Sequence, residues 1–376
     1  MEENNNPLEN NNPINPENNP TNPPENTPEN VPTHETYMPP APSFETTPPQ
    51  PVATSSFGAP RIDLSIVNQK VTQARAEIGK YLIGQYEMVD LLLIGLFSGG
   101  HVLLEGVPGI AKTLTAKVLA QTLSVDFSRI QFTPDMMPSD IIGTSVFNMK
   151  DSEFNFKKGP IFTNIALIDE INRAPAKTQA ALFEVMEERQ ITYDGTTYKL
   201  DFPFLVIATQ NPIEQEGTYR LPEAQLDRFL FKINLLHPNL SEEQEILRRY
   251  KNNTRINFAA IPSIFSKQDL QKIQQTLEGI RVEDSVIKYI AEITHETRAH
   301  GKIYLGASPR ASLSMLKSAK AMAAIRGRDF VIPDDVQYVA YHVLNHRIIL
   351  TPEAEMEGMD ANLVIQEIIK KVEVPR

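Results

Sequence analysis

The clearest indication of the fold is the segment HVLLEGVPGIAKTLTAKVLAQTL at residues 101–123. Its first five residues form a short apolar run, and a loop of small residues separates this run from a helical pattern at 114–123. A strand, such a loop and a helix in this order form a phosphate-binding unit. The loop turns backbone N–H groups inward, and the helix directs its positive end at the phosphates. The stretch therefore predicts an α/β fold with a ligand site after the strand.

Four residues of the loop match the chemistry of a triphosphate chain. Gly106 and Gly109 let the backbone approach the phosphates, Lys112 reaches the terminal phosphates, and Thr113 supplies a hydroxyl for Mg²⁺. The strict pattern has a second glycine where this chain has Ala111. We expect Ala111 to have right-handed backbone angles, because a methyl group costs little there. The predicted nucleotide-binding set is completed by Val107, Pro108, Ile110, Ala111 and Leu114.

Four further apolar runs have the length of buried parallel strands, which lack polar alternation because helices cover both faces of the sheet. They lie at 127–132, 165–169, 204–209 and 229–236. Helical patterns at 114–123 and 177–188 follow the first and the third strand. This alternation predicts a five-stranded parallel sheet in a three-layer α/β/α domain, which we place at residues 61–236.

The pattern changes to amphipathic helices in residues 237–376, for which we predict a smaller, all-helical domain. One of these helices is well marked, because Ser308 can cap its N-terminus, Pro309 suits its first position and Gly327 follows its end. The expected helices lie at 241–250, 267–277, 284–298, 308–326 and 333–345.

The first 60 residues have the composition of a disordered tail. They carry 15 of the 29 prolines and eight Glu, with neither Lys nor Arg. We expect a solvating tether, and a docking peptide is the alternative. The remaining chain accounts for only −3 of the formal net charge of −11. That balance argues against a nucleic-acid partner, because backbone phosphates are held mainly by Lys and Arg.

Several classes of protein are disfavoured by absences in the sequence. The chain has no Cys, which excludes disulfides and thiolate metal sites. The most apolar segment, 88–104, is interrupted by Asp90 and falls short of the roughly 18 unbroken apolar residues of a membrane span. The sequence begins without the basic and apolar regions of a secretory signal. We therefore expect a cytoplasmic protein without a membrane span.

Histidine pairs do not predict a transition-metal site. His295 and His300 are five residues apart, which places the two rings on different faces of a helix. His342 and His346 have helical spacing, but neither a third ligand nor a general base accompanies them.

The run at 165–169 ends in Asp169, and Glu170 follows it directly, so two adjacent carboxylates stand at the end of this predicted strand. Parallel sheets bind their ligands at the carboxyl ends of the strands. Asp169 can hold Mg²⁺ through water, and Glu170 can orient or deprotonate an attacking water. The pair therefore implies hydrolysis and not only binding.

Three further polar residues are candidates by their position. Asn211 follows the strand at 204–209, where it can bond the γ-phosphate or the attacking water; a turn-initiating Asn before Pro is the alternative. Arg228 precedes the last predicted strand. Arg310 lies in the first turn of a helix, where it opposes the helix dipole and calls for a partner such as a phosphate. For both arginines, a surface ion pair is the alternative.

Taken together, these residues resemble the MoxR family of AAA+ ATPases over essentially all of residues 61–376. The resemblance rests on residues 99–113, 132–135, 138–141, 169–175, 222–229 and 306–311. Ala111 fits it, because the family commonly has Ala at this position. The resemblance implies an AAA+ P-loop NTPase core followed by a helical lid domain, with ATP and Mg²⁺ as cofactors.

The resemblance also assigns roles to the candidate residues. They are Lys112 and Thr113 in Walker A, Asp169 and Glu170 in Walker B, Asn211 as sensor 1, Arg228 as the arginine finger, Arg310 as sensor 2, and Gly84 and Gln85 in the segment that contacts adenine.

An arginine finger acts on the ATP of a neighbouring subunit, so the resemblance implies a ring, expected to be a hexamer. Residues 138–160 are similar to the helix-2 insert of this clade, and residues 190–201 to its pre-sensor-1 hairpin. Both are expected to line a pore or meet a protein client. A partner with a von Willebrand factor A domain is implied by the resemblance alone.

Our leading hypothesis is a MoxR-type AAA+ ATPase that couples ATP hydrolysis to remodelling or maturation of a protein client, or to insertion of a metal cofactor. The alternative is a nucleic-acid motor or a chelatase-type AAA+ subunit. The hairpin expected at 190–201 offers only Arg189 and Lys199 as basic residues, which argues against a role in tracking a nucleic-acid strand. A third class is a nucleotide-binding scaffold or small-molecule kinase, against which Glu170, Arg228 and the helical lid argue.

Overall fold

The structure is a computed structural model that describes residues 62–107, 109–150, 152–212, 218–251 and 256–375. These residues belong to one compact unit, Ala59–Arg376. The predicted tail at 1–60 lies outside the described residues, and so does Pro108. The division into domains at residues 236 and 237 stays a prediction.

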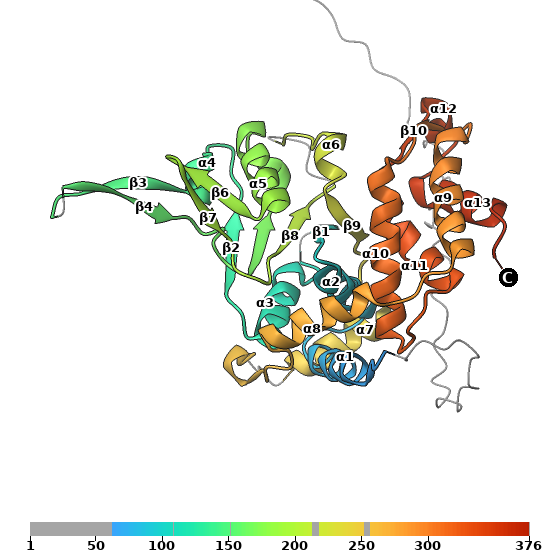
Figure 1. The fold of residues 1–376 in the computed structure, drawn as a ribbon, viewed down its shortest axis with the longest axis horizontal. Coiled ribbons are helices and arrows are strands. Elements are labelled where there is room, and N and C mark those ends of the chain that lie inside the picture. Colours follow the sequence, from blue (N-terminus) through green and yellow to red (C-terminus); the bar gives the residue numbers. More distant parts are fainter. Residues whose placement is uncertain (1–61, 108, 151, 213–217, 252–255, 376) are drawn as a thin grey trace, which may run out of the picture. The chain divides into compact units, whose positions relative to one another are not determined.

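Five parallel strands form the central sheet, in the order β2-β5-β8-β1-β9 (Figure 1). They are β1 (His101–Glu105), β2 (Phe127–Gln131), β5 (Ile165–Asp169), β8 (Leu205–Gln210) and β9 (Phe229–Asn234). All five predicted strands are confirmed, although β9 ends before residue 236. In the register of the sheet, Asp169 pairs with Gln131 and Glu105 pairs with Gln210. The ends that carry the polar candidates therefore meet at one edge.

Helices cover both faces of this sheet. Val102 and Leu104 enter one hydrophobic core, whereas Leu103 between them enters a second core. The first core contains α1 (Ser65–Ile78), α2 (Tyr86–Ser98) and α3 (Lys112–Leu123), and the second contains α4 (Pro138–Ile142) and α5 (Ala176–Glu188). The predicted three-layer α/β/α architecture is confirmed.

The helices α1 and α2 were not predicted. Nine of the 13 residues of α2 are buried, so its sequence lacks the polar face that makes a helix recognisable. Among the described helices, none is long and apolar enough to cross a membrane.

Two antiparallel hairpins interrupt the α/β series. The first, β3 (Gly143–Asn148) with β4 (Glu153–Lys158), extends away from the sheet (Figure 1). The second, β6 (Gln190–Tyr193) with β7 (Thr196–Lys199), occupies the expected hairpin at 190–201. Its turn residues Asp194 and Gly195 both have positive φ, as a two-residue hairpin turn of type I′ requires. Short helices are η1 (Ile171–Arg173) and α6 (Glu223–Leu226).

The C-terminal part is helical, as predicted, and adds one small β pair. Its helices are α7 (Leu240–Tyr250), η2 (Phe258–Ala260), α8 (Lys267–Glu278), α9 (Asp284–Ala299), α10 (Pro309–Ile325), α11 (Pro333–Leu344), α12 (Pro352–Met356) and α13 (Ala361–Lys371). The pair β10 (Ile303–Leu305) with β11 (Ile349–Leu350) is antiparallel and was not predicted. Ser308 caps α10 as expected, because its side chain accepts from the Arg310 N–H. We refer to residues 284–371 as the lid.

Candidate nucleotide site

The loop between β1 and α3 contains two glycines, one required by close packing and the other by its backbone conformation. A methyl group on Gly106 would lie 2.5 Å from Ile110 Cδ1 and 3.0 Å from the Leu235 carbonyl oxygen, so packing requires the glycine. Gly109 has φ of +90°, a conformation that L side chains rarely adopt, and open space beside its Cα. The loop is thus narrow at its base and open at its tip.

Ala111 does not have the right-handed backbone angles that we expected. Its φ of 64° and ψ of 19° are left-handed, and it is the N-cap residue of α3. Its carbonyl oxygen accepts from both the N–H and the hydroxyl of Thr115, which holds this conformation in place. A left-handed conformation costs roughly 1–2 kcal/mol for a residue with a Cβ. The glycine of the strict pattern would avoid this cost.

Lys112 and Thr113 begin α3 beside the cavity. The Lys112 ammonium donates to the carbonyl oxygens of Gly106 and Gln210, the latter at 3.3 Å. These contacts hold the ammonium between the loop and the end of β8. Both residues are half-buried, and both line the cavity described below.

The two carboxylates at the end of β5 have different environments. Asp169 is buried; its Oδ1 accepts from the Thr209 hydroxyl at 3.1 Å, and its Oδ2 from Arg129 Nε at 2.5 Å. Glu170 has a left-handed φ of 56°, its N–H donates to the Thr209 hydroxyl oxygen at 3.0 Å, and its carboxylate pairs with Arg173 at 2.8 Å. Such unfavourable backbone conformations concentrate at functional sites, because the surrounding structure must hold them.

These residues line one cavity of about 320 Å³, a volume within the usual range of ligand pockets. The lining consists of Gly109, Ala111, Lys112, Thr113, Leu114, Arg129, Gln131, Asp169, Glu170, Thr209 and Asn211. The structure therefore brings eight of the sixteen predicted site residues together, including Asn211, which is 8% exposed. Of the described loop residues, Gly106, Val107 and Ile110 are not among those that line the cavity.

Three lining residues were missed by the sequence reasoning. Arg129 and Gln131 are on β2, with the buried Ile130 between them, and Thr209 is on β8. The alternation of Arg129, Ile130 and Gln131 was a usable signal, since residues two apart on a strand share a face. That they share a face with Asp169 depends on β2 lying next to β5, which the sequence does not state.

Gly84 and Gln85 lie elsewhere, before α2. Gly84 has φ of +74°, and a methyl group there would lie 2.4 Å from the Glu242 carboxyl carbon. Gly84 is therefore packed against α7, and neither it nor Gln85 is among the residues that line the cavity. Their contact with adenine stays a prediction.

The two candidate arginines also lie outside the cavity lining, and both contact Glu187 at the end of α5. Arg228 donates to the Phe183 carbonyl oxygen at 2.9 Å and lies 3.7 Å from the Glu187 carboxylate. Arg310 lies 3.1 Å from the same carboxylate and 3.8 Å from that of Asp227. Each arginine thus forms the ion pair that was the alternative to a phosphate contact.

The donor set of the cavity fits a magnesium nucleotide. Lys112, Arg129 and the N-terminus of α3 supply positive charge for phosphates. The Thr113 hydroxyl and the Asp169 carboxylate supply the hard oxygen atoms that Mg²⁺ prefers. The two observed bonds to Asp169 leave further acceptor capacity on its oxygens, because an ionised carboxylate has about four lone-pair sites.

Comparison with known proteins finds two family models that match parts of the chain. Residues 101–231 match the model of the ATPase family associated with various cellular activities (AAA), and residues 295–368 match the AAA lid domain. The chain is 46% identical over 303 residues to the uncharacterised protein YeaC of Bacillus subtilis, covering 81% of this chain and 94% of that protein.

A second relative and a solved structure are also similar to this chain. The chain is 44% identical over 309 residues to the chaperone MoxR1 of Mycobacterium tuberculosis, covering 80% of this chain and 81% of MoxR1. The crystal structure of a candidate ATPase from Cytophaga hutchinsonii superposes with a TM-score of 0.77 at 46% identity, covering 83% of this chain and 97% of that chain. The chain therefore belongs to the MoxR family of AAA+ ATPases.

Proposed function

We propose that this protein hydrolyses ATP to ADP and phosphate in the cavity lined by the loop after β1, the start of α3 and the ends of β2, β5 and β8. The observation that carries the proposal is the convergence of Lys112, Thr113, Asp169 and Glu170 on one cavity. Lys112 holds the terminal phosphates, and Thr113 and Asp169 hold Mg²⁺. Glu170 takes the proton of the attacking water, and Asn211 orients that water or the γ-phosphate. Bound Mg²⁺ neutralises charge on the phosphates.

The arrangement of Arg228 supports a ring in which subunits complete one another's sites. Arg228 does not line the cavity of its own chain, and its side chain is half-buried beside α5. An arginine that acts in trans has this property, since it belongs to a neighbour's site. We therefore propose an oligomeric ring, a hexamer by family resemblance, with Arg228 as the arginine finger and Arg310 as sensor 2.

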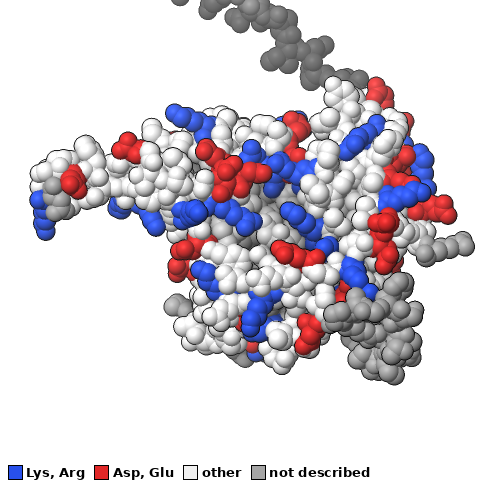
Figure 2. Space-filling model, viewed as in Figure 1, with Lys and Arg blue, Asp and Glu red and all other residues white. Residues whose placement is uncertain are grey.

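The hairpin β3–β4 supports a protein client as the target of this activity. Phe147, Met149 and Phe154 are 49%, 87% and 71% exposed, and the rings of Phe147 and Phe154 pack at 5.2 Å. Exposed apolar clusters of this kind mark contacts with other proteins. Over the face in Figure 2, acidic and basic side chains are interspersed, which does not favour a nucleic-acid track.

The mechanical output is then remodelling or maturation of a protein client, or insertion of its metal cofactor. The similarity to a relative named a chaperone agrees with this proposal. The proposal includes a partner with a von Willebrand factor A domain because of the family resemblance. If repeated co-purification recovered no such protein, the partner would be dropped from the proposal. Hydrolysis stimulated by DNA in a salt-dependent manner would favour the alternative of a nucleic-acid motor.

The first experiment measures phosphate release per chain across a wide range of protein concentration, with Mg²⁺ and ATP and no partner. We expect specific activity to rise with concentration, because assembly completes the sites. Arg228→Ala should keep ATP binding and lose roughly 10³-fold or more in turnover, and mixing it with Glu170→Gln should restore part of the activity. A demonstrated monomer that hydrolyses ATP at the same specific rate would overturn the ring.

A further inference from the structure

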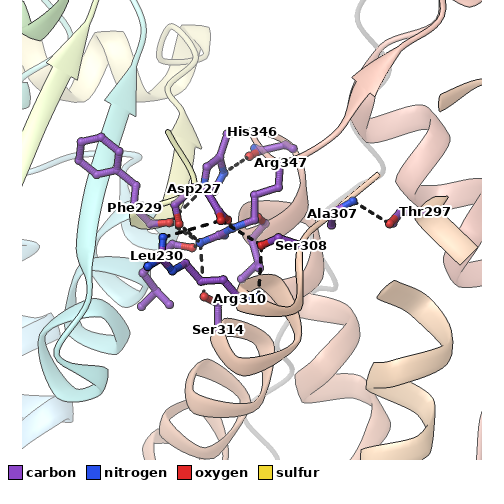
Figure 3. Close-up of polar contacts among 12 residues, drawn as sticks. Asp227, Phe229, Leu230, Thr297, Ala307, Ser308, Arg310, Ser314, His346 and Arg347 are labelled. Atoms are coloured by element: carbon purple, nitrogen blue, oxygen red, sulfur yellow. Dashed lines mark hydrogen bonds and ion pairs between the residues drawn. The ribbon is translucent and has the colours of Figure 1, made fainter. Parts of the chain in front are cut away.

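The guanidinium group of Arg347, in the lid, is buried against the segment that carries Arg228. Its side chain is 2% exposed. Nε donates to Asp227 Oδ1 at 2.7 Å, and Nη2 to the carbonyl oxygens of Asp227 at 3.0 Å and of Phe229 at 2.6 Å (Figure 3). Nη1 donates to the Leu230 carbonyl oxygen at 3.1 Å. Arg347 therefore binds the residue before Arg228 and the two residues after it.

The remaining contacts of this guanidinium tie the segment to two lid helices. Nη1 donates to the Val343 carbonyl oxygen at 2.6 Å, in α11, and Nη2 lies 3.3 Å from the Ser314 hydroxyl, in α10. A buried charge is tolerated when its donors are paired in this way, and it imposes a definite geometry on its acceptors. A flexible lysine could not make the same set of contacts.

Asp227 continues the network to the N-terminus of α10. Its Oδ2 accepts from the Ser308 hydroxyl at 2.9 Å and lies 3.8 Å from Arg310 (Figure 3). One carboxylate thus contacts three lid side chains and belongs to the residue adjacent to Arg228. On the other side, Glu187 contacts both Arg228 and Arg310.

We propose that Asp227 and Arg347 are positioning residues that fix Arg228 relative to the lid. The inference rests on the proposed function, in which Arg228 serves the ATP of a neighbour and Arg310 that of its own chain. Arg310 contacts the carboxylates of Glu187 and Asp227, and Glu187 also contacts Arg228. Engagement of Arg310 with a phosphate therefore changes the surroundings of Arg228. The network therefore couples the nucleotide of one subunit to the arginine that it presents to the next.

A purely structural anchor would have a different signature, and the lid contains a matched control for it. Asp335 is fully buried and accepts from Arg328 at 2.6 and 2.7 Å and from Arg326 at 3.1 Å. This pairing lies where α10 ends and α11 begins, whereas Ser308 and Arg310 lie at the opposite end of α10. Asp335→Asn removes a carboxylate charge that is paired with arginine, as Asp227→Asn does, but away from Arg228.

The experiment compares Asp227→Asn, Arg347→Lys and Asp335→Asn in the full chain. For each variant we would measure the thermal midpoint, the ATP affinity in a Glu170→Gln background, and turnover at saturating ATP. We expect Asp227→Asn and Arg347→Lys to keep ATP affinity within about threefold and to lose roughly 10- to 100-fold in turnover, because a small misplacement of a catalytic group has effects of this size. Asp335→Asn should lower the midpoint and leave turnover within about threefold.

Mixing identifies which arginine is affected. In a ring mixed with Glu170→Gln subunits, an Asp227→Asn subunit receives a correctly placed Arg228 from its neighbour, so its own site should regain part of its turnover. Absence of this rescue in a stable mixed ring, or a turnover loss no larger than that of Asp335→Asn, overturns the inference. If Arg228→Ala itself keeps full turnover, the proposed function fails first. If Arg228→Ala loses turnover and the two positioning variants do not, only this inference fails.

Discussion

Arg129 Nε and Asp169 Oδ2 lie 2.5 Å apart, so a half-exposed guanidinium contacts the buried carboxylate that we assign to Mg²⁺. Both residues line the cavity. Arg129 therefore places a positive charge where we propose that phosphates bind, and it lowers the negative potential at the proposed metal position. We therefore expect Arg129 to strengthen the binding of the nucleotide and to weaken the binding of Mg²⁺ at Asp169.

Arg129→Gln should weaken ATP binding without Mg²⁺ by roughly three- to tenfold, because a charge-assisted contact in the cavity is lost. The Mg²⁺ concentration needed for half-maximal binding should fall, since Asp169 is less neutralised. Both are measured by titrating a fluorescent ATP analogue into the Glu170→Gln background, with EDTA or increasing Mg²⁺. Lys232→Gln, which breaks a 2.7 Å pair with Glu105 outside the cavity lining, is the control. Equal effects of the two changes would contradict a specific role of Arg129.

Lys112→Ala and Glu170→Gln should separate binding from turnover. The ammonium group of Lys112 lies beside the loop, where it would contact the terminal phosphates of ATP, so its loss should nearly abolish ATP binding. Glu170→Gln keeps the size of the side chain and removes the base, so binding should persist while turnover falls by roughly 10²–10⁴-fold. Equilibrium binding and phosphate release on the same samples decide the matter. Tight retention of ATP by Lys112→Ala would refute its assignment.

Ala111→Gly should stabilise the fold, although most replacements by glycine destabilise. The left-handed angles of Ala111 cost roughly 1–2 kcal/mol, and glycine removes this cost. Part of the gain is lost, because glycine also gives the unfolded chain more conformational freedom. We expect a net gain of about 0.5–1 kcal/mol in the free energy of unfolding. Ala180→Gly, at an exposed position inside α5, should lose about 1 kcal/mol and is the matched control. Urea unfolding of both variants gives the two signs, and a loss at Ala111 would contradict the conformational argument.

The five strands and the phosphate loop could be predicted because their signals are local. Short apolar runs end in polar residues, and the loop residues follow β1 directly along the chain. Features that depend on which strands are neighbours could not be predicted. Arg129 reaches Asp169 only because β2 pairs with β5. The shared contact of Arg228 and Arg310 with Glu187 brings together residues more than 40 positions apart.

Two misses have other physical causes. The backbone of Ala111 follows from the turn into α3 and not from its side chain, so a rule based on residue preference gave the wrong angles. Arg347 was overlooked because a lone arginine is usually exposed, whereas here six acceptor contacts pair its buried guanidinium.

Two buried histidines should make the fold sensitive to mild acid. His101 is buried beside Phe204; its Nε2–H donates to the Met186 carbonyl oxygen at 3.0 Å, and its Nδ1 accepts from the Val206 N–H at 2.9 Å. Burial lowers the pKa of His101 from 6.5 to about 4, and burial also lowers the pKa of His346 well below its usual value. Both rings are therefore neutral in the folded chain at neutral pH.

The direction of the pH effect follows from these lowered pKa values. Below pH 6.5 the unfolded chain binds a proton at His101, while the folded chain does not until the pH approaches 4. The free energy of unfolding therefore falls as the pH falls through this window and is unaffected by His101 above it. Between pH 8 and pH 5.5 we expect His101 alone to account for a loss of about 1.4 kcal/mol, and His346 to add to it.

Urea unfolding of the parent and of His101→Gln at pH 8 and pH 5.5 measures this contribution. Glutamine can donate to Met186 and accept from Val206 but has no proton to gain, so the variant should lose less stability than the parent on acidification. The variant is expected to be less stable than the parent at pH 8, because its side chain fills the space beside Phe204 less well. The comparison therefore uses the change with pH and not the absolute value. An equal loss in the two proteins between pH 8 and pH 5.5 would mean that other groups cause the acid sensitivity.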